Sequence, residues 1–545
     1  MIPMRLPRVA RHGALALVAA VLLFVVIVRV RLAAAPLERD EGEYAYAGQL
    51  ILHGIPPYEL AYNMKFPGTY YAYALVMAVF GQTATGIRLG LALVNVATAL
   101  LVFAIGRRLY GRFVGAVATV AFALLSLDRW IMGVFAHATH FVLLPALAGL
   151  FLLLRAPTAR RAPSLLAGGA LLGLAVLVKQ HGFTFIPLGA FVVWQANLAA
   201  GRGTRRLLLE LGLLALGAIL PFALLCAVFQ YQGVFGSFWY WTIQYAREYV
   251  SEVPLSAFFP NLVRGLGTVW QAMGPLWLVG AVGFIGLWSG RWGRPEKMFL
   301  TVLLAASFLA ICPGLYFREH YFILVLPAVA LLDGVAIASA ARLLERAMSG
   351  PSARALAATV FLGLTLFLVA RQGDFLFQMS PQELSRARYG RNPFIESVAI
   401  ANYIRERTTP EDRIAVLGSE PQIYFYSGRR SATGYIYMYP LMERQRYADR
   451  MQEELIHQIE TVHPTYLVLV QIVTSWLPRI TSTKRIVEWA NLYTSRCYDL
   501  VGITDIVSSN ETRYVWDEAV TGYHPASKNL IFVFRRKSDA HCPPG

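Results

Sequence analysis

Long apolar runs, repeated along most of the chain, constrain the fold of this protein more than any other feature. The runs lie at residues 14–28, 84–106, 113–127, 132–154, 163–178, 183–198, 207–229, 268–288, 298–317, 320–341 and 355–370. A helix of about 20 apolar residues crosses the hydrocarbon core of a bilayer. The pattern therefore predicts a mainly α, polytopic bundle of about eleven transmembrane helices. One explanation for the shorter runs, such as 113–127, is that they end at a water-filled cavity.

The composition agrees with a membrane protein, because 57% of the 545 residues are hydrophobic and only 15% are charged. The formal net charge is +17 at pH 7. In a soluble protein such a charge would favour nucleic acid as a partner. In a membrane protein the basic residues gather in cytoplasmic loops next to anionic lipid. We therefore expect membrane lipid as a partner and no nucleic acid.

The basic residues are grouped in alternate loops. With the N-terminus placed in the cytoplasm, each cytoplasmic loop holds a cluster of them: Arg107, Arg108 and Arg112; Arg155, Arg160 and Arg161; Arg202, Arg205 and Arg206; Arg291, Arg294 and Lys297; Arg342, Arg346 and Arg354. The loops on the opposite side hold mostly single basic residues, such as Arg129. The alternation follows the positive-inside rule. We predict a multi-pass protein of the inner (plasma) membrane with a cytoplasmic N-terminus and a periplasmic or otherwise extracytoplasmic C-terminal part.

The tail from residue 372 changes character. Its pattern predicts helices at 399–407, 443–462 and 476–491, and strands at 413–418, 422–426, 464–470 and 529–534. Alternating helices and strands are typical of a small α/β domain with some parallel pairing. The sequence thus predicts a transmembrane domain at 1–371 and a soluble extracytoplasmic α/β domain at 372–545. In an oxidising compartment Cys497 and Cys542 would be able to form a disulfide, which the sequence leaves open.

The segment between the first two apolar runs, residues 36–83, concentrates charge near the end of a span. Three acids crowd its start, and a lone lysine follows later: Asp40, Glu41, Glu43 and Lys65. Charged residues at the mouth of a membrane span are costly and often mark functional sites. The structural alternative is that Asp40 and Glu41 cap a helix starting near Gly42 and that Lys65 pairs with one of them.

These residue types suit the transfer of an activated sugar. Formation of a glycosidic bond needs a base near the acceptor hydroxyl and positive charge near the departing phosphate. A carboxyl at the end of a span is a suitable base, since partial burial raises its pKa toward the working pH. Lys65 is a suitable phosphate partner. From the residues alone, sugar transfer and the structural alternative are about equally supported.

Three short motifs, in order along the chain, resemble those of the C-type (GT-C) membrane glycosyltransferases, the group of protein mannosyltransferases and lipid A aminoarabinose transferases. They are the acid-acid-x-x-Tyr element at 40–44 with the lysine and proline of 65–67, the Gly-Leu-Ala-x-x-x-Lys element at 173–179, and the Arg-x-x-Tyr element at 318–321. The resemblance covers roughly residues 10–370. It implies a GT-C-like fold for the transmembrane domain and leaves the C-terminal domain without a named activity.

The resemblance also implies an activity: the inverting transfer of a sugar from a polyprenyl-phosphate donor to a lipid-linked glycan, lipid or protein acceptor at the outer face of the membrane. By position, Asp40 would be the catalytic base, and Glu41 would assist it or orient the acceptor. Lys65, Lys179 and Arg318 would bind the donor phosphate. The remaining candidates would line the substrate cavity: Glu43, Tyr44, His137, His140, His320 and Tyr321.

Two departures from the family pattern concern metal binding. Met64 precedes Lys65 where the aminoarabinose-transferase branch has an acid, and His137 and His140 stand where many relatives have an acid beside a threonine. The two histidines share a helix face and either line a polar cavity or bind a metal or the acceptor. No third ligand is evident in the sequence. We therefore predict no cofactor and no required metal, although a divalent metal is compatible with the family.

Two functions stay open at this point. The first is a mannosyltransferase-like glycosyltransferase of the cell envelope. The alternative is a non-catalytic transporter or flippase of a polyprenyl-linked glycan, in which the same charges bind phosphate without chemistry. Two of the phosphate candidates also have plain structural interpretations: Lys179 as a lysine that extends from a span end to the interface, and Arg318 as half of a local ion pair.

Overall fold

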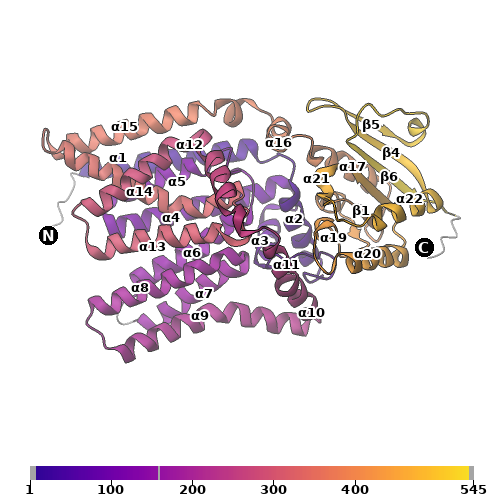
Figure 1. Cartoon of the computed structure of the whole chain (residues 1–545). Coiled ribbons are helices and arrows are strands. Elements are labelled where there is room, and N and C mark those ends of the chain that lie inside the picture. The colour runs from indigo at the N-terminus through magenta and orange to yellow at the C-terminus, as the bar shows by residue number, and fades with distance from the viewer. Residues whose placement is uncertain (1–7, 158–159, 539–545) are drawn as a thin grey trace. The chain divides into compact units, whose positions relative to one another are not determined.

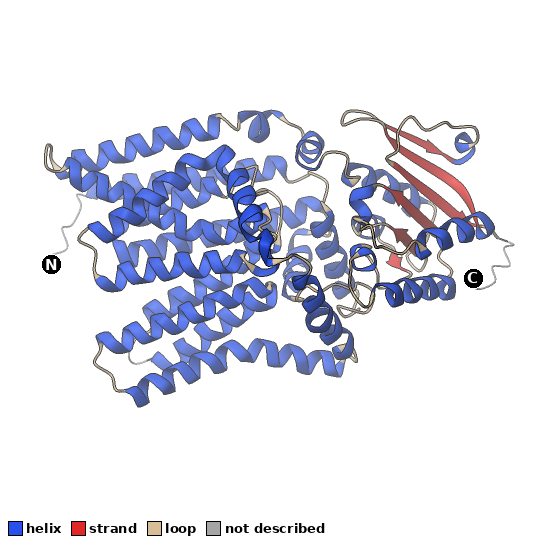
Figure 2. Ribbon diagram, in the orientation of Figure 1, coloured by secondary structure: helices blue, strands red, loops and turns tan. Residues whose placement is uncertain are grey.

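A computed structural model describes residues 8–157 and 160–538 of the chain (Figure 1). The chain divides into two compact units, each made of segments that are distant in sequence. We call them the helical unit, formed by Met1–Ala33, Arg88–Val228 and Val253–Gln378, and the mixed unit, formed by Ala34–Ile87, Phe229–Glu252 and Met379–Gly545. Helices make up the helical unit, and the mixed unit combines helices with the sheet drawn in red in Figure 2.

Long apolar helices build most of the helical unit. Among the described residues, 9 helical segments are long and apolar enough to cross a membrane. They are α1 (Arg8–Leu32, apolar from Leu15), α4 (Ala84–Tyr110), α6 (Ala138–Arg155), α7 (Arg161–Val178), η2 with α8 (Gln180–Ala199), α9 (Thr204–Tyr231), η4 with α12 (Leu255–Ser289), η6 with α14 (Glu319–Leu344) and α15 (Gly350–Ala370). The prediction of a polytopic helical membrane protein is confirmed.

Two of the predicted apolar runs form helices that do not meet this criterion. Helix α5 (Arg112–Leu125) has only 14 residues, and α13 (Arg294–Ile311) begins with the charged residues Arg294, Glu296 and Lys297. The count of about eleven spans therefore stays a prediction.

Glycines allow the helices of this unit to approach closely. A Cβ atom on Gly169 or Gly173 of α7 would lie 2.2 Å from the carbonyl oxygen of Leu214 or Ala218 on α9. Lipid tails are as apolar as leucine, so helices in a membrane are held by close packing rather than by a hydrophobic driving force. These glycines are therefore required by the contact between α7 and α9.

A buried carboxylate joins the ends of three helices in the same unit. Glu210 of α9, which is 1% exposed, accepts hydrogen bonds from Arg161 (2.7 Å), Asn197 (2.8 Å), Arg202 (3.2 Å) and Arg206 (3.1 Å). The arginines belong to loops that the charge pattern predicts to be cytoplasmic. These arginines thus hold the helix ends together, in addition to their expected effect on the orientation of the chain in the membrane.

The mixed unit contains a six-stranded sheet in the order β2-β1-β3-β6-β4-β5. The strands are β1 (Arg413–Leu417), β2 (Arg430–Ser431), β3 (Tyr466–Gln471), β4 (Tyr498–Ile506), β5 (Thr512–Trp516) and β6 (Leu530–Arg536). Strand β1 pairs in parallel with β2 and β3, and the other pairs are antiparallel. The predicted small α/β domain with some parallel pairing is confirmed.

Helices accompany the sheet in the mixed unit. Those from the C-terminal segment are α16 (Pro381–Tyr389), α17 (Phe394–Glu406), α18 (Gln422–Ser427), α19 (Tyr439–Met442), α20 (Ala448–Val462), α21 (Val473–Trp476) and α22 (Arg485–Cys497). Those from the earlier segments are α2 (Arg39–Leu52), α3 (Gly68–Phe80), α10 (Phe235–Trp239), η3 (Tyr240–Tyr245) and α11 (Ala246–Ser251). Most residues of the core strands β1 and β3 are buried, as their apolar runs predict.

Three details of the C-terminal segment differ from the prediction. The expected strand at 422–426 is helix α18, which ends at Gly428 in the left-handed conformation (φ 65°). The expected helix at 476–491 is displaced to α22, because Leu477 has a positive φ of 49° and Pro478 follows it. The antiparallel pair β4–β5 was not predicted. Cys542 lies outside the described residues, so its pairing with Cys497 stays a prediction.

Helix α2 packs tightly against α18 within the mixed unit. A Cβ atom on Gly42 would lie 2.7 Å from Cβ, 2.8 Å from the backbone nitrogen and 2.9 Å from Cα of Gln422. Residues 34–87 therefore share a compact unit with the C-terminal segment, although the sequence division places them in the transmembrane domain. The domain boundary between residues 371 and 372 stays a prediction.

Gly42→Ala is expected to destabilise the mixed unit. Alanine favours a helix over glycine by about 1 kcal/mol, but overpacking against backbone atoms costs about 1–3 kcal/mol. We therefore expect a net loss of up to about 2 kcal/mol, measured as a lower unfolding temperature of the purified protein in detergent. The matched control is Gly212→Ala, at a helical glycine with no neighbouring atom within 4 Å. An unfolding temperature of Gly42→Ala equal to or above that of the wild type would contradict this packing.

Candidate active site

The first turn of α2 is fixed by a capping box. Glu38 is the N-cap: its carboxylate accepts from the backbone N–H of Glu41 at 2.9 Å, and the Glu41 carboxylate accepts from the backbone N–H of Glu38 at 3.2 Å. The helix therefore begins at Arg39, so the structural alternative is wrong in making Asp40 and Glu41 the caps of a helix that starts near Gly42. Its second part, the pairing of Lys65 with one of these acids, is confirmed for Asp40. Glutamate is a less common N-cap than aspartate, which is why the sequence pattern favoured the later residues.

This helix start places Asp40 and Glu43 on one face, three residues apart. Lys65 lies between their carboxylates: its Nζ donates to Asp40 Oδ1 at 2.8 Å and to Glu43 Oε2 at 2.5 Å. The Glu43 side chain is 0% exposed, whereas that of Asp40 is 27% exposed. The three residues form one charged group, the acid–lysine cluster, in which Asp40 is the carboxylate that is accessible from outside.

Tyrosines surround the acid–lysine cluster. Tyr70 donates its hydroxyl hydrogen bond to Glu43 Oε1 at 2.6 Å, and Tyr437 donates to Asp40 Oδ1 at 2.9 Å. The Nζ of Lys65 lies 4.6 Å from the ring centre of Tyr44 and 5.4 Å from that of Tyr437, within the range of cation–π attraction. The sequence predicted Tyr44 but neither Tyr70 nor Tyr437.

Burial and charge set the protonation of the cluster in opposite ways. Burial disfavours the charge on Lys65, but the carboxylates of Asp40 and Glu43 outweigh it and raise the pKa of Lys65 well above its ordinary value. Burial raises the pKa of Glu43, although Lys65 acts in the opposite direction. Lys65 is therefore charged at neutral pH, and Glu43 is the acid in which burial favours the neutral form.

The predicted site residues of the helical unit form a second group. The ring of His137, at the N-cap of α6, stacks on His320 at 4.3 Å and 13°, and His320 meets Tyr321 edge-on at 4.8 Å. Lys179 Nζ lies 4.2 Å from the ring centre of Tyr321. The ring centre of His181 lies 4.8 Å from the same ring centre of Tyr321. The structure thus brings together four predicted residues and His181, which the sequence reading missed although it lies two positions after Lys179.

Two other predicted residues of this unit are placed differently. His140 is buried in the first turn of α6, one turn beyond His137. Arg318 is exposed, and its guanidinium lies 5.2 Å from the ring centre of the neighbouring Tyr316. The roles that the sequence predicts for the site residues of both units stay predictions. These roles include phosphate binding and lining of the substrate cavity.

Comparison with known proteins identifies the fold. Residues 64–225 match the family model of dolichyl-phosphate-mannose-protein mannosyltransferase. The structure of ArnT from Cupriavidus metallidurans bound to undecaprenyl phosphate is similar over 97% of this chain and 98% of that chain, with a TM-score of 0.59 at 17% sequence identity. The chain therefore has the fold of the solved ArnT, as the predicted resemblance to GT-C proteins implies. No curated protein matches the sequence.

Two further solved structures share the GT-C fold. ArnT from the same organism in the apo state gives a TM-score of 0.60 at 18% identity and covers 96% of this chain and 98% of that chain. The archaeal oligosaccharyltransferase AglB from Archaeoglobus fulgidus, in complex with an inhibitory peptide and a dolichol-phosphate, gives 0.50 at 13% identity and covers 92% and 74%. The predicted resemblance to GT-C proteins is therefore confirmed at the level of the fold.

In this chain, Glu41 and Glu43 have different surroundings from those the motif suggested. Glu41 is 0% exposed and its carboxylate takes part in the capping box, whereas the Glu43 carboxylate contacts Lys65. In a helix, residues three positions apart lie on the same face and adjacent residues do not. Asp40 therefore shares its face with Glu43 and not with Glu41. The catalytic role of Glu41 stays a prediction, and Glu43 is the better-placed partner of Asp40.

Proposed function

We propose that this chain is a glycosyltransferase that moves a sugar, with inversion, from a polyprenyl-phosphate donor to an acceptor. The GT-C fold and the mannosyltransferase family match support sugar transfer. The solved ArnT binds undecaprenyl phosphate, and the solved AglB binds a dolichol-phosphate and an inhibitory peptide, which supports a lipid-phosphate donor. The observation that carries the proposal is the partly exposed carboxylate of Asp40 held 2.8 Å from the ammonium group of Lys65.

Asp40 acts as the general base of the proposed reaction. It takes the proton of the acceptor hydroxyl while the acceptor oxygen bonds to the anomeric carbon. The bond between that carbon and the phosphate oxygen breaks on the opposite face, and its electron pair leaves with polyprenyl phosphate. General-base assistance of this kind contributes about 10²–10⁴-fold to a rate.

Lys65 supplies the positive charge for the departing phosphate. An ammonium group has three N–H donors, and Asp40 and Glu43 accept two of them. Donor binding would draw Lys65 toward the phosphate and leave Asp40 to the acceptor hydroxyl. Glu43, fully buried and hydrogen-bonded by Tyr70, would continue to accept its hydrogen bond from Lys65 during this change. No step of this proposal requires a metal or cofactor.

A tracer assay tests the proposed function. Membranes containing the chain are incubated with polyprenyl-phosphate sugars labelled in the sugar, and label is followed into lipid-linked glycan, lipid and protein fractions. We expect label in one of these fractions and release of unlabelled polyprenyl phosphate. A protein that moves the intact labelled donor across the membrane without releasing polyprenyl phosphate would be a carrier, and the proposal would be wrong.

We further propose that the reaction takes place at the outer face of the inner membrane, as the loop charges favour. Ile480 in the C-terminal segment and Gly203 in the loop between α8 and α9 are both exposed. In intact cells we expect a membrane-impermeant maleimide to label Ile480→Cys but not Gly203→Cys, which should react only after lysis. The unsubstituted chain is the control for its own cysteines. Labelling of Gly203→Cys alone in intact cells would reverse the orientation.

A further inference from the structure

A residue from the C-terminal segment contacts the acid–lysine cluster. Tyr437 lies just before α19, and its hydroxyl donates to Asp40 Oδ1 at 2.9 Å. Its side chain is buried. Burial, and then the nearby Asp40 carboxylate, raise the pKa of Tyr437 well above its ordinary value. The hydroxyl therefore keeps its proton and acts as a hydrogen-bond donor to the proposed base.

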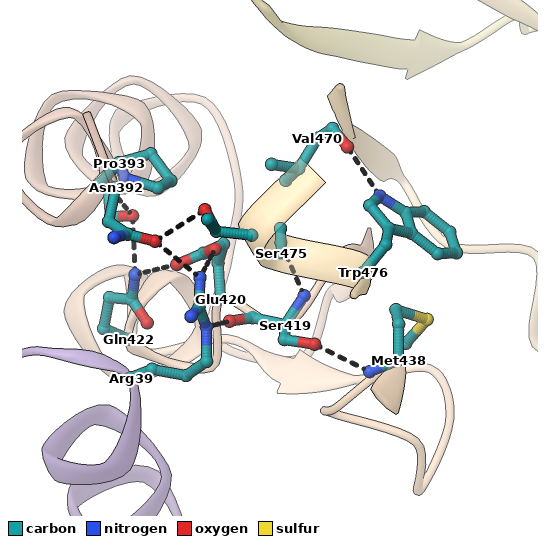
Figure 3. Close-up of polar contacts among 12 residues, drawn as sticks. Arg39, Asn392, Pro393, Ser419, Glu420, Gln422, Met438, Val470, Ser475 and Trp476 are labelled. Carbon is teal, nitrogen blue, oxygen red and sulfur yellow. Dashed lines mark hydrogen bonds and ion pairs between the residues drawn. The ribbon is translucent and has the colours of Figure 1, made fainter. Parts of the chain in front are cut away.

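The residue before Asp40 is anchored in the same C-terminal segment. The guanidinium of Arg39 donates to the carboxylate of Glu420 and to the carbonyl of Ser419, which follow β1 (Figure 3). Glu420 is 0% exposed and also accepts from Gln422 Nε2 at 2.7 Å. The rings of Phe394 and Tyr439 lie 5.4 and 5.5 Å from the guanidinium. A buried, hydrogen-bonded ion pair of this kind is rigid, because breaking it would leave a buried charge without a partner.

Ser419 connects this anchor to the loop that carries Tyr437. Its carbonyl accepts from Arg39, and its hydroxyl accepts from the backbone N–H of Met438 at 2.9 Å (Figure 3). Its own N–H donates to Ser475 Oγ at 2.8 Å. One hydrogen-bonded network therefore holds both the first turn of α2 and the tyrosine that contacts Asp40.

We propose that the C-terminal segment positions the catalytic base. In this proposal, which rests on the proposed function, Tyr437 is a positioning residue that fixes the Asp40 carboxylate, and the Arg39–Glu420 pair fixes the helix turn that carries it. Catalysis depends steeply on such placement, since a 1 Å displacement of a reacting group can cost about 100-fold in rate. The α/β segment is then part of the catalytic apparatus rather than an appended binding module.

Tyr437→Phe tests the proposal, because it removes only the hydroxyl. We expect kcat to fall by about 10–100-fold, the range for loss of a hydrogen bond to a charged group, with the donor KM and the unfolding temperature unchanged. The matched control is Tyr435→Phe. Tyr435 is buried in the same loop and donates to a carboxylate, Glu454 Oε2, at 3.0 Å. The control should retain wild-type kcat.

A double-mutant cycle separates positioning from general structural damage. If Tyr437 acts through Asp40, Tyr437→Phe should not lower the residual rate of Asp40→Asn any further. If Tyr437→Phe also lowers the unfolding temperature, the cycle still decides, because structural damage would lower the residual rate of Asp40→Asn as well. Wild-type kcat in Tyr437→Phe, or a further loss of rate when it is added to Asp40→Asn, would overturn the inference. That result is distinct from failure of the proposed function, in which Asp40→Asn itself would remain active.

Discussion

Asp40→Asn is expected to lower the rate of sugar transfer by about 10²–10⁴-fold or more, because asparagine has no basic carboxylate to take the acceptor's proton. The substitution preserves the shape of the side chain. Its amide oxygen can still accept hydrogen bonds from Lys65 and Tyr437, which now contact Asp40 Oδ1. We therefore expect donor affinity and the unfolding temperature to stay close to those of the wild type. The measurement is the initial rate of label transfer beside equilibrium binding of the donor.

The matched control for Asp40→Asn is Glu59→Gln. Glu59 is an exposed acid in the same segment between the first two apolar runs. Both substitutions remove one negative charge, so a change in the net charge of the segment affects them equally. We expect Glu59→Gln to transfer sugar at the wild-type rate. Equal rates for Asp40→Asn and the wild type would show that Asp40 is not the base.

Lys65→Met should lower both stability and donor affinity. Removing one partner of a buried ion pair costs about 3–5 kcal/mol, and Glu43, 0% exposed, would lose its cation. The donor would lose a charged hydrogen bond to its phosphate, a loss of about 10–100-fold in affinity. Thermal unfolding and donor binding, measured on the same detergent preparation, report the two effects. Wild-type donor affinity in Lys65→Met would remove Lys65 from the phosphate site.

The double variant Lys65→Met with Glu43→Gln distinguishes the two effects. Replacing a buried ion pair by neutral groups is often nearly neutral for stability, and only the partly exposed Asp40 would be left without its cation. We therefore expect the double variant to recover most of the lost unfolding temperature. Donor affinity should remain low, since the phosphate still lacks its cation. Recovery of donor binding together with stability would mean that Lys65 has a structural role only.

Local sequence patterns were sufficient to predict the membrane helices and to select Asp40, Glu41, Glu43 and Lys65 as candidate site residues. Asp40 and Lys65 lie within one segment between two apolar runs, so the cost of charge near a membrane pointed to them directly. The second partner of Lys65, Glu43, was harder to predict, because the adjacent acids of the motif drew attention to Glu41. The capping box that occupies Glu41 depends on Glu38, a glutamate N-cap that sequence preference does not favour.

Contacts between distant parts of the chain could not be read from the sequence. Tyr437 contacts Asp40 across 397 positions, and nothing in its neighbourhood distinguishes it from Tyr435 or Tyr439. Helix α18 was mistaken for a strand because its aromatic residues are typical of strands. Its helical form is linked to Gly428, which ends the helix in the left-handed conformation, and to the close contact with Gly42. For such short elements, tertiary packing rather than local propensity decides whether the residues form a helix or a strand.

The most direct test of the central claim is the amount of polyprenyl phosphate released per enzyme molecule at saturating donor and acceptor. The acid–lysine cluster of Asp40, Glu43 and Lys65 predicts many turnovers for the wild type, and bound donor with almost no release for Asp40→Asn. Release by Asp40→Asn at the wild-type rate, or a wild type that binds the donor and releases none, would contradict the account.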